Sequence, residues 1–167
     1  MSELARPRKA TQAASAILVI NCGSSSVKFA LFAAGQSLSR LWSGSVDRIG
    51  LANGHFHIAD ADGATIANRT GFFSNHETAL GQVLEAVERD ASTPRLMAVG
   101  HRVVHGGAEC DCPVVVTRAL ETRLRELIPL APLHQPHNLA GIAAVRNVRP
   151  DIPQVGGSDG SLGSDEA

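Results

Sequence analysis

Residues 17–28 read ILVINCGSSSVK, and they indicate both a fold and a chemistry. Its four leading apolar residues are mostly β-branched and predict a buried strand. The small polar segment 21–26 follows, and an apolar strand resumes at Val27 with Lys28 beside it. Gly23 and three serines let the backbone approach an anion and supply N–H and O–H donors. The order is typical of a phosphate cradle, but an ordinary hairpin turn with a solvated lysine fits the same residues.

The composition bounds what the chain can be. Its 167 residues, 44% of them hydrophobic, suit one domain or part of a larger one. A net charge of −1 and 4% aromatic residues argue against nucleic acid as a partner. No apolar run approaches the roughly 18 residues that cross a membrane, and residues 1–15 lack the apolar core of a signal peptide and predict a flexible leader. Three cysteines, an odd number, fit a cytoplasmic protein without a disulfide framework.

Further strands are predicted along the chain. Asn53-Gly54 lies between two strand-like runs and is a strong hairpin signal. A second turn is predicted at Gly50. The segments with strand character are 39–47, 55–59, 96–104 and 114–116, with another strand beginning in 151–155.

Helices alternate with the later strands. Ser74, with Glu77 three residues later, predicts a helix N-terminus with a capping box, and apolar residues recur at helical spacing over 80–87. Thr117 predicts the cap of a second helix, and residues 139–148 predict a third, amphipathic one. A strand meander followed by alternating helices and strands indicates a mixed α/β fold.

A second group of candidates lies in residues 100–107, GHRVVHGG. On a strand, Arg102 and Val104 share one face, and His101 and His105 share the other. An arginine at a strand end beside glycines can bind a carboxylate or phosphate through two hydrogen bonds. The valine can line an apolar wall next to it. The bland alternative is a core strand whose histidines are bonded to backbone groups.

A metal site is a rival interpretation of the same region. Its ligands would be His101, His105, Cys110 and Cys112. Their spacing fits no usual zinc pattern, which counts against this interpretation.

The third candidate segment is residues 130–138, LAPLHQPHN. Two prolines around His134, in a loop before a helix, can hold that histidine rigidly. The alternative is a plain connection between helices, with a helix starting near Pro136 and a solvated histidine.

Taken together and in this order, the three motifs resemble the acetate kinase family, which includes propionate and butyrate kinases. The chain is similar to the N-terminal part of that family over about residues 16–155. The resemblance implies an α/β fold, namely a ribonuclease-H-like domain of the actin, sugar-kinase and Hsp70 (ASKHA) superfamily. It implies the N-terminal domain only, and an incomplete one.

The resemblance also implies a reaction and its partners. The reaction is Mg2+- or Mn2+-dependent transfer of the γ-phosphoryl of ATP to acetate, giving ADP and acetyl phosphate, in an intact family member that is a homodimer. Asn21 would help to hold Mg2+, and His134 would sit at the transferring phosphoryl. The remaining implied contacts are nucleotide phosphates at Lys28, Ser24, Ser25 and Ser26, the acetate carboxylate at Arg102, and the acetate methyl at Val104 and Leu133.

Residues 156–167, GGSDGSLGSDEA, depart from the family pattern. We expect them to form a disordered tail, produced by a frameshift, a gene-model error or a truncation. The family places a catalytic aspartate just after Val155. Asp159 lies near that position, but its neighbours do not predict a strand, so the role is not transferred to it. We therefore expect no appreciable kinase activity from this chain; a non-catalytic fragment that binds nucleotide or acyl phosphate is the alternative.

Overall fold

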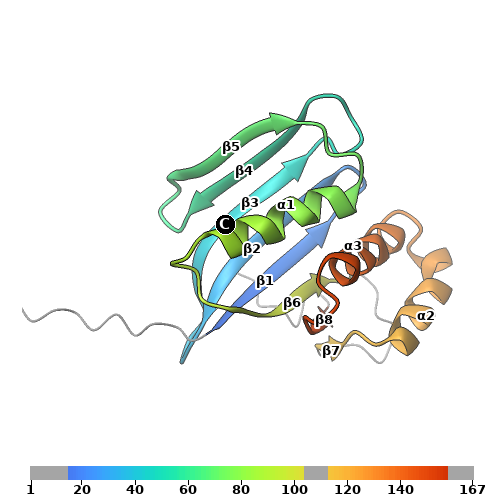
Figure 1. The fold of residues 1–167 in the computed structure, drawn as a ribbon. Helices are drawn as coiled ribbons and strands as arrows, with labels where there is room; N and C mark the ends of the chain where they lie inside the picture. The colour runs from blue at the N-terminus through green and yellow to red at the C-terminus, as the bar shows by residue number, and fades with distance from the viewer. Residues whose placement is uncertain (1–14, 104–112, 158–167) are drawn as a thin grey trace, which may run out of the picture.

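A mixed sheet of eight strands runs through the computed structural model, which describes residues 15–103 and 113–157 (Figure 1). Its strands are β1 (Ser15–Cys22), β2 (Ser26–Ala34), β3 (Ser39–Asp47), β4 (Gly54–Asp60), β5 (Thr65–Gly71), β6 (Leu96–Arg102), β7 (Val114–Val115) and β8 (Gln154–Gly157). The helices are α1 (His76–Arg89), α2 (Arg118–Glu126), α3 (Gln135–Val148) and the 3-10 turn η1 (Ile128–Leu130). The mixed α/β order expected from the sequence is therefore confirmed.

The sheet joins an antiparallel meander to two parallel pairs, and its last pair, β7 with β8, is again antiparallel. The strand order is β5-β4-β3-β2-β1-β6-β8-β7. Strands β1 to β5 form an antiparallel meander, whereas β1 pairs with β6, and β6 with β8, in parallel. Parallel neighbours need a crossover connection. The chain from β1 to β6 passes through α1, and the chain from β6 to β8 passes through α2 and α3.

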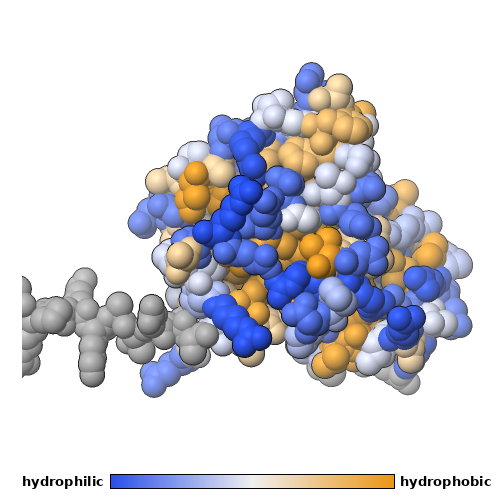
Figure 2. All heavy atoms as spheres, viewed as in Figure 1, coloured by the Kyte–Doolittle hydropathy of each residue, from blue (hydrophilic) through white to orange (hydrophobic). Residues whose placement is uncertain are grey.

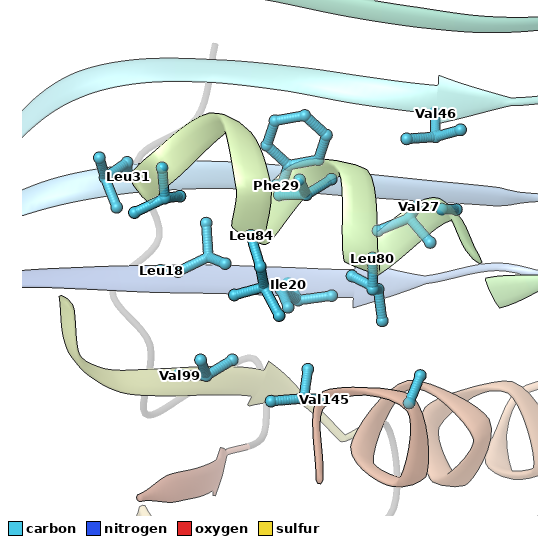
Figure 3. Packing of buried hydrophobic residues seen from close by; sticks show 14 of the residues in the cluster. Leu18, Ile20, Val27, Phe29, Leu31, Val46, Leu80, Leu84, Val99 and Val145 are labelled. Atoms are coloured by element: carbon cyan, nitrogen blue, oxygen red, sulfur yellow. The ribbon is translucent and has the colours of Figure 1, made fainter. Parts of the chain in front are cut away.

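The main core lies between the sheet and helix α1 (Figure 3). Burial alternates strictly along β1, so that Leu18 and Ile20 face the core while Ile17 and Val19 are half-buried on the other face. Leu80 and Leu84 of α1 pack against this inner face, with 0% and 2% of their surfaces exposed. On the outside, hydrophilic and hydrophobic residues are interspersed on the face that carries α1 and α3 (Figure 2). The helical spacing over residues 80–87 correctly predicted which side of α1 is buried against the sheet.

Helix α3 approaches the end of β1 closely. A Cβ atom added at Gly141 would lie 2.5 Å from the Sγ atom of Cys22, which is too close for any real contact. The glycine therefore allows the helix to sit directly on the sheet at this point. Burial among apolar groups raises the pKa of the Cys22 thiol to about 12.

Helix α2 packs on α3 through a smaller core and one buried ion pair. Leu124 of α2 clusters with Leu139 and Ile142 of α3. Glu121, whose side chain is 6% exposed, accepts a hydrogen bond from Arg146 of α3. The predicted cap is confirmed, because the Thr117 hydroxyl accepts a hydrogen bond of 3.2 Å from the Leu120 amide.

The predicted start of α1 was wrong by one residue. Asn75 is the N-cap, and its side chain accepts a 2.9 Å hydrogen bond from the Thr78 amide. The Ser74 hydroxyl instead forms a 2.9 Å hydrogen bond with the Thr78 hydroxyl. This shift breaks the capping-box spacing, and Glu77 instead accepts a hydrogen bond from Asn147 of α3.

The predicted hairpin between the two strand-like runs is confirmed, because β3 and β4 pair antiparallel, but its connection spans residues 48–53 and Gly54 already belongs to β4. The positive φ angles in this connection belong to Arg48 (59°) and Gly50 (84°), so the Gly50 turn is confirmed. Gly54 is the first residue of β4, and a Cβ there would lie 2.5 Å from the Phe73 ring. The absence of a side chain at Gly54 therefore allows the Phe73 ring to approach the start of β4 closely.

One strand and two element boundaries differ from what the apolar patterns predicted. Strand β5 was not predicted at all. Helix α3 begins at Gln135, which confirms the alternative of a helix start near Pro136 and lies four residues before the predicted amphipathic segment 139–148. Strand β8 continues through Gly156 and Gly157, where the sequence predicted that regular structure ends, and both glycines are buried in the sheet. Among the described residues, no helix is long and apolar enough to span a membrane.

Candidate functional site

Most of the predicted site residues gather at one edge of the sheet. Strands β1 and β6 are parallel and end there, and contacts described below place the N-termini of α1 and α3 at the same edge (Figure 1). In α/β sheets, ligands bind outside the carboxyl ends of the strands, where helix N-termini also present free N–H groups. The candidate site is therefore this end of the sheet, where β1 and β6 terminate, and not one of its edge strands.

Asn21, Lys28 and Arg102 form a row across three neighbouring strands. Asn21 of β1 is the direct partner of Lys28 on β2. Ile20 is paired with His101 on β6, so Asn21 and Arg102, the next residue on each strand, lie side by side. Ile20 and His101 are buried on the face that α1 and α3 cover. Because side chains alternate along a strand, the row lies on the opposite face.

The turn between β1 and β2 is held by its backbone. The Gly23 amide donates to the Ser26 carbonyl (2.8 Å), and the Ile49 amide donates to the Ser25 carbonyl (2.9 Å). Ser24 and Ser25 are exposed, and Ser26 is half-buried. A backbone fixed in this way leaves the serine hydroxyls and the exposed Lys28 ammonium facing solvent, as a phosphate cradle requires.

His134 lies at the N-terminus of α3. It occupies the N-cap position, its side chain makes no capping hydrogen bond, and Pro136 is in the first turn. Its carbonyl accepts hydrogen bonds from the His137 and Asn138 amides, both 3.1 Å. The imidazole is exposed, whereas the backbone beneath it is fixed.

The predicted apolar wall for a substrate methyl is not assembled by the described residues. Leu133 is 76% exposed, and Val104 lies outside the described ranges. Both assignments stay predictions.

The rival metal site receives no support from His101. That histidine is 2% exposed, and its Nε2 atom donates a 2.7 Å hydrogen bond to Oε1 of Gln154. Burial lowers the pKa of His101 to about 4, against a smaller opposing effect of the hydrogen bond. Within residues 15–103 and 113–157, no group of three or more His, Cys, Asp or Glu side chains could hold a metal ion. The alternative of a core strand whose histidines bond to backbone groups is corrected as well. His101 is buried in the core, but its hydrogen-bond partner is the Gln154 side chain. His105, Cys110 and Cys112 lie outside the described residues.

Sequence reasoning missed Asp47. It is the direct partner of Ser26 across β2 and β3, and its carboxylate accepts a 2.6 Å hydrogen bond from the Ser45 hydroxyl. The register of β2 and β3 brings this carboxylate beside the turn of Ser24, Ser25 and Ser26, called the serine turn below. No local sequence pattern around Asp47 predicts this position.

Sequence reasoning also missed two histidines between the serine turn and His134. The Nε2 atom of His76, the first residue of α1, donates to the Gly23 carbonyl at 2.7 Å. The His76 and His137 rings stack with their centroids 6.1 Å apart. Burial lowers the pKa of His137, and the charges of His76 and His134 lower it further.

Comparison with known proteins identifies the family of this chain. Residues 16–162 match the sequence model of the Acetokinase family. An acetate kinase from Streptomyces griseus is 43% identical over 144 residues, covering 83% of this chain and 35% of the relative. The chain thus spans about a third of the length of the curated relatives that it matches.

Two solved structures share the fold. The crystal structure of an acetate kinase from Porphyromonas gingivalis superposes with a TM-score of 0.79 at 35% identity, covering 87% of this chain and 37% of that one. A propionate kinase from Francisella tularensis gives a TM-score of 0.78 at 31% identity with the same coverage. The expected ASKHA-type N-terminal domain is therefore confirmed. By its sequence and its fold, the chain belongs to the acetokinase family of enzymes.

Proposed function

We propose that this chain is the phosphate- and carboxylate-binding N-terminal part of an acetate-kinase-type phosphotransferase. The reaction is transfer of the γ-phosphoryl of ATP to acetate, giving ADP and acetyl phosphate, in a cytoplasmic protein that is a homodimer when intact. The observation that carries the proposal is the row of Asn21, Lys28 and Arg102 on one face of the sheet, at the edge where the strands end.

Each member of the row has a distinct role in this proposal. Lys28 and the hydroxyls of the serine turn bind the nucleotide phosphates, because an ammonium and a set of short donors suit a phosphate. Arg102 binds the carboxylate of acetate or the acyl phosphate through its planar pair of N–H groups. His134, exposed on a fixed turn, donates to the phosphoryl group that is transferred.

The residues beside the turn fit a magnesium ion. The Asn21 amide, the serine hydroxyls and the half-buried Asp47 carboxylate offer only hard oxygen donors, which Mg2+ prefers. Mg2+ keeps several waters and substrate phosphates as ligands, so it does not need a site built of protein atoms alone. When bound, the ion would neutralise phosphate charge; Asn21 would hold it, and Mn2+ would fit the same donors.

Phosphoryl transfer depends on alignment and charge rather than on covalent help from the protein. The chain covers 35% of the acetate kinase from Streptomyces griseus and 37% of that from Porphyromonas gingivalis, and its cations contact the reacting groups from one side. We therefore propose that it binds ligands but turns over no substrate alone.

A three-carbon acid is the second candidate substrate. The similarity to the propionate kinase structure equals that to the acetate kinase structure within 0.01 in TM-score. An exposed Leu133 also sets no limit on the length of the acyl chain.

The test combines binding with turnover. Isothermal titration of the purified chain with acetyl phosphate, propionyl phosphate and ATP, each with Mg2+, should give saturable binding. A hydroxamate assay on the same protein should give no acyl phosphate. Absence of binding by all three ligands contradicts the proposed site, and magnesium-dependent turnover contradicts the proposed inactivity.

A further inference from the structure

His76 joins three segments at the candidate site that lie far apart in the sequence. It is the first residue of α1, whose N-cap Asn75 fixes the helix start. Its ring donates from Nε2 to the Gly23 carbonyl at 2.7 Å, and it stacks on His137 in the first turn of α3. The ring is half-buried, and α1, which carries it, and His137 of α3, on which it stacks, fix its position.

This hydrogen bond fixes the direction of one backbone donor. All peptide bonds in the described residues are trans. In a planar trans peptide, the carbonyl of one residue and the amide N–H of the next point in opposite directions. Because the Gly23 carbonyl points at His76, the Ser24 N–H points away from it. No described residue accepts a hydrogen bond from that amide. It is an oriented donor at the turn.

The stacking contact couples this turn to His134. The His137 amide donates to the His134 carbonyl, and the His137 ring lies against the ring of His76. A shift of His76 therefore alters both the peptide plane at Gly23 and the turn that carries His134.

We infer that His76 is a positioning residue that turns the Gly23–Ser24 peptide so that the Ser24 N–H faces a bound phosphate. The inference rests on the proposed function in so far as the turn binds phosphate. His76 itself contacts no substrate; it acts through the backbone that it holds. The nearest local alternative, a solvated histidine at a helix start, predicts no effect on Ser24.

Three variants separate the hydrogen bond from the ring. His76→Phe keeps the stacking on His137 and removes the donor, whereas His76→Gln keeps a donor at a similar reach. His55→Phe is the matched control, because His55 also bonds through Nε2, to Asn68 at 2.6 Å, and also stacks on a histidine, His57. Urea unfolding of each variant establishes that it is folded.

The first readout is the Ser24 amide in the free protein, followed by 1H–15N NMR. His76→Phe should shift this resonance and speed its hydrogen exchange, while His76→Gln and His55→Phe leave it near its wild-type position. The second readout is titration with inorganic pyrophosphate and Mg2+. Loss of the oriented donor should weaken binding by about tenfold in His76→Phe, with recovery in His76→Gln.

The two readouts distinguish failure of the inference from failure of the proposed function. An unchanged Ser24 amide in His76→Phe, or equal pyrophosphate affinity of that variant and the wild type, overturns the inference. If the wild type binds no pyrophosphate while the Ser24 amide still moves in His76→Phe, then the proposed function fails and the positioning of the turn by His76 stands.

Discussion

His101 and Gln154 are hydrogen-bonded side chain to side chain across two parallel strands, with 2.7 Å between Nε2 and Oε1. The two residues are 2% and 6% exposed. The amide oxygen accepts, so the Nε2 atom carries the proton. This bond links β8 to β6 at the residue that precedes Arg102. The position of Arg102 therefore depends on the protonation state of a buried imidazole.

Acidification should therefore destabilise the protein. The pKa of His101 is lowered from 6.5 to about 4 by burial. Below pH 6.5 the unfolded chain binds a proton that the folded chain refuses, so the free energy of unfolding falls with pH until about 4. The expected loss is on the order of 3 kcal/mol. Urea unfolding at a series of pH values measures it.

Two variants assign this pH dependence. His101→Gln should be less stable at pH 7 but flatter between pH 6.5 and 4. His137→Gln should remove only a smaller part of the slope, because the pKa of His137 is lowered at a less buried site. An unchanged slope in His101→Gln would count against the buried neutral imidazole.

The contact between Gly141 and Cys22 gives a second prediction. In an open helix, Gly→Ala stabilises by up to about 1 kcal/mol. Gly141→Ala should instead destabilise by about 1–2 kcal/mol, because its Cβ would lie 2.5 Å from the Cys22 Sγ atom. Gly81→Ala in α1 is the control, since a Cβ there meets nothing within 4 Å. Adding Cys22→Ala should partly restore the Gly141 variant; full additivity of the two changes would refute the contact.

The ion pair between α2 and α3 gives a third. Among the described residues, Arg146→Met leaves the Glu121 carboxylate, 6% exposed, with Arg125 at 4.0 Å as its remaining charged partner. An uncompensated buried charge costs about 3 kcal/mol or more, measurable by urea unfolding. Arg125→Met, which removes the exposed partner, should cost less than about 1 kcal/mol. Similar losses in the two variants would show that Glu121 has no preferred partner.

The two cations of the row should separate two ligands. Lys28→Met is expected to weaken pyrophosphate binding by about tenfold, and Arg102→Met to weaken acetate and acetyl phosphate binding by a similar factor. Arg40→Met, at the far end of β3, changes the net charge equally and should affect neither. If all three variants lower both affinities alike, then the effect is one of overall charge.

Local patterns in the sequence predicted the elements with strong periodicity. Alternation over residues 39–47 matched β3, and the stripe over 80–87 found the buried side of α1. Strand β5 could not be found in this way, because it lies at the sheet edge and shows no alternating burial. The start of α3 was indicated by the proline near position 136 and not by the apolar stripe, because its first turn is polar, with buried Gln135 and Asn138.

The site was predicted only as far as motifs extend. Asn21, Lys28, Arg102 and His134 stand in short motifs that resemble one family. His76 reaches Gly23 across a separation of 53 residues, and Asp47 reaches Ser26 through strand register, so both depend on the fold. The charges and backbone directions of the site arise from such long-range contacts.

Every role proposed for the site requires that the turn between Asn21 and Lys28 binds phosphate. The most direct measurement is a 1H–15N NMR titration of the chain with inorganic pyrophosphate and Mg2+. We expect saturable shifts concentrated in residues 21–28 and at the start of α1, abolished in Lys28→Met. Shifts scattered over the surface, or a Lys28→Met variant that titrates like the wild type, would contradict it.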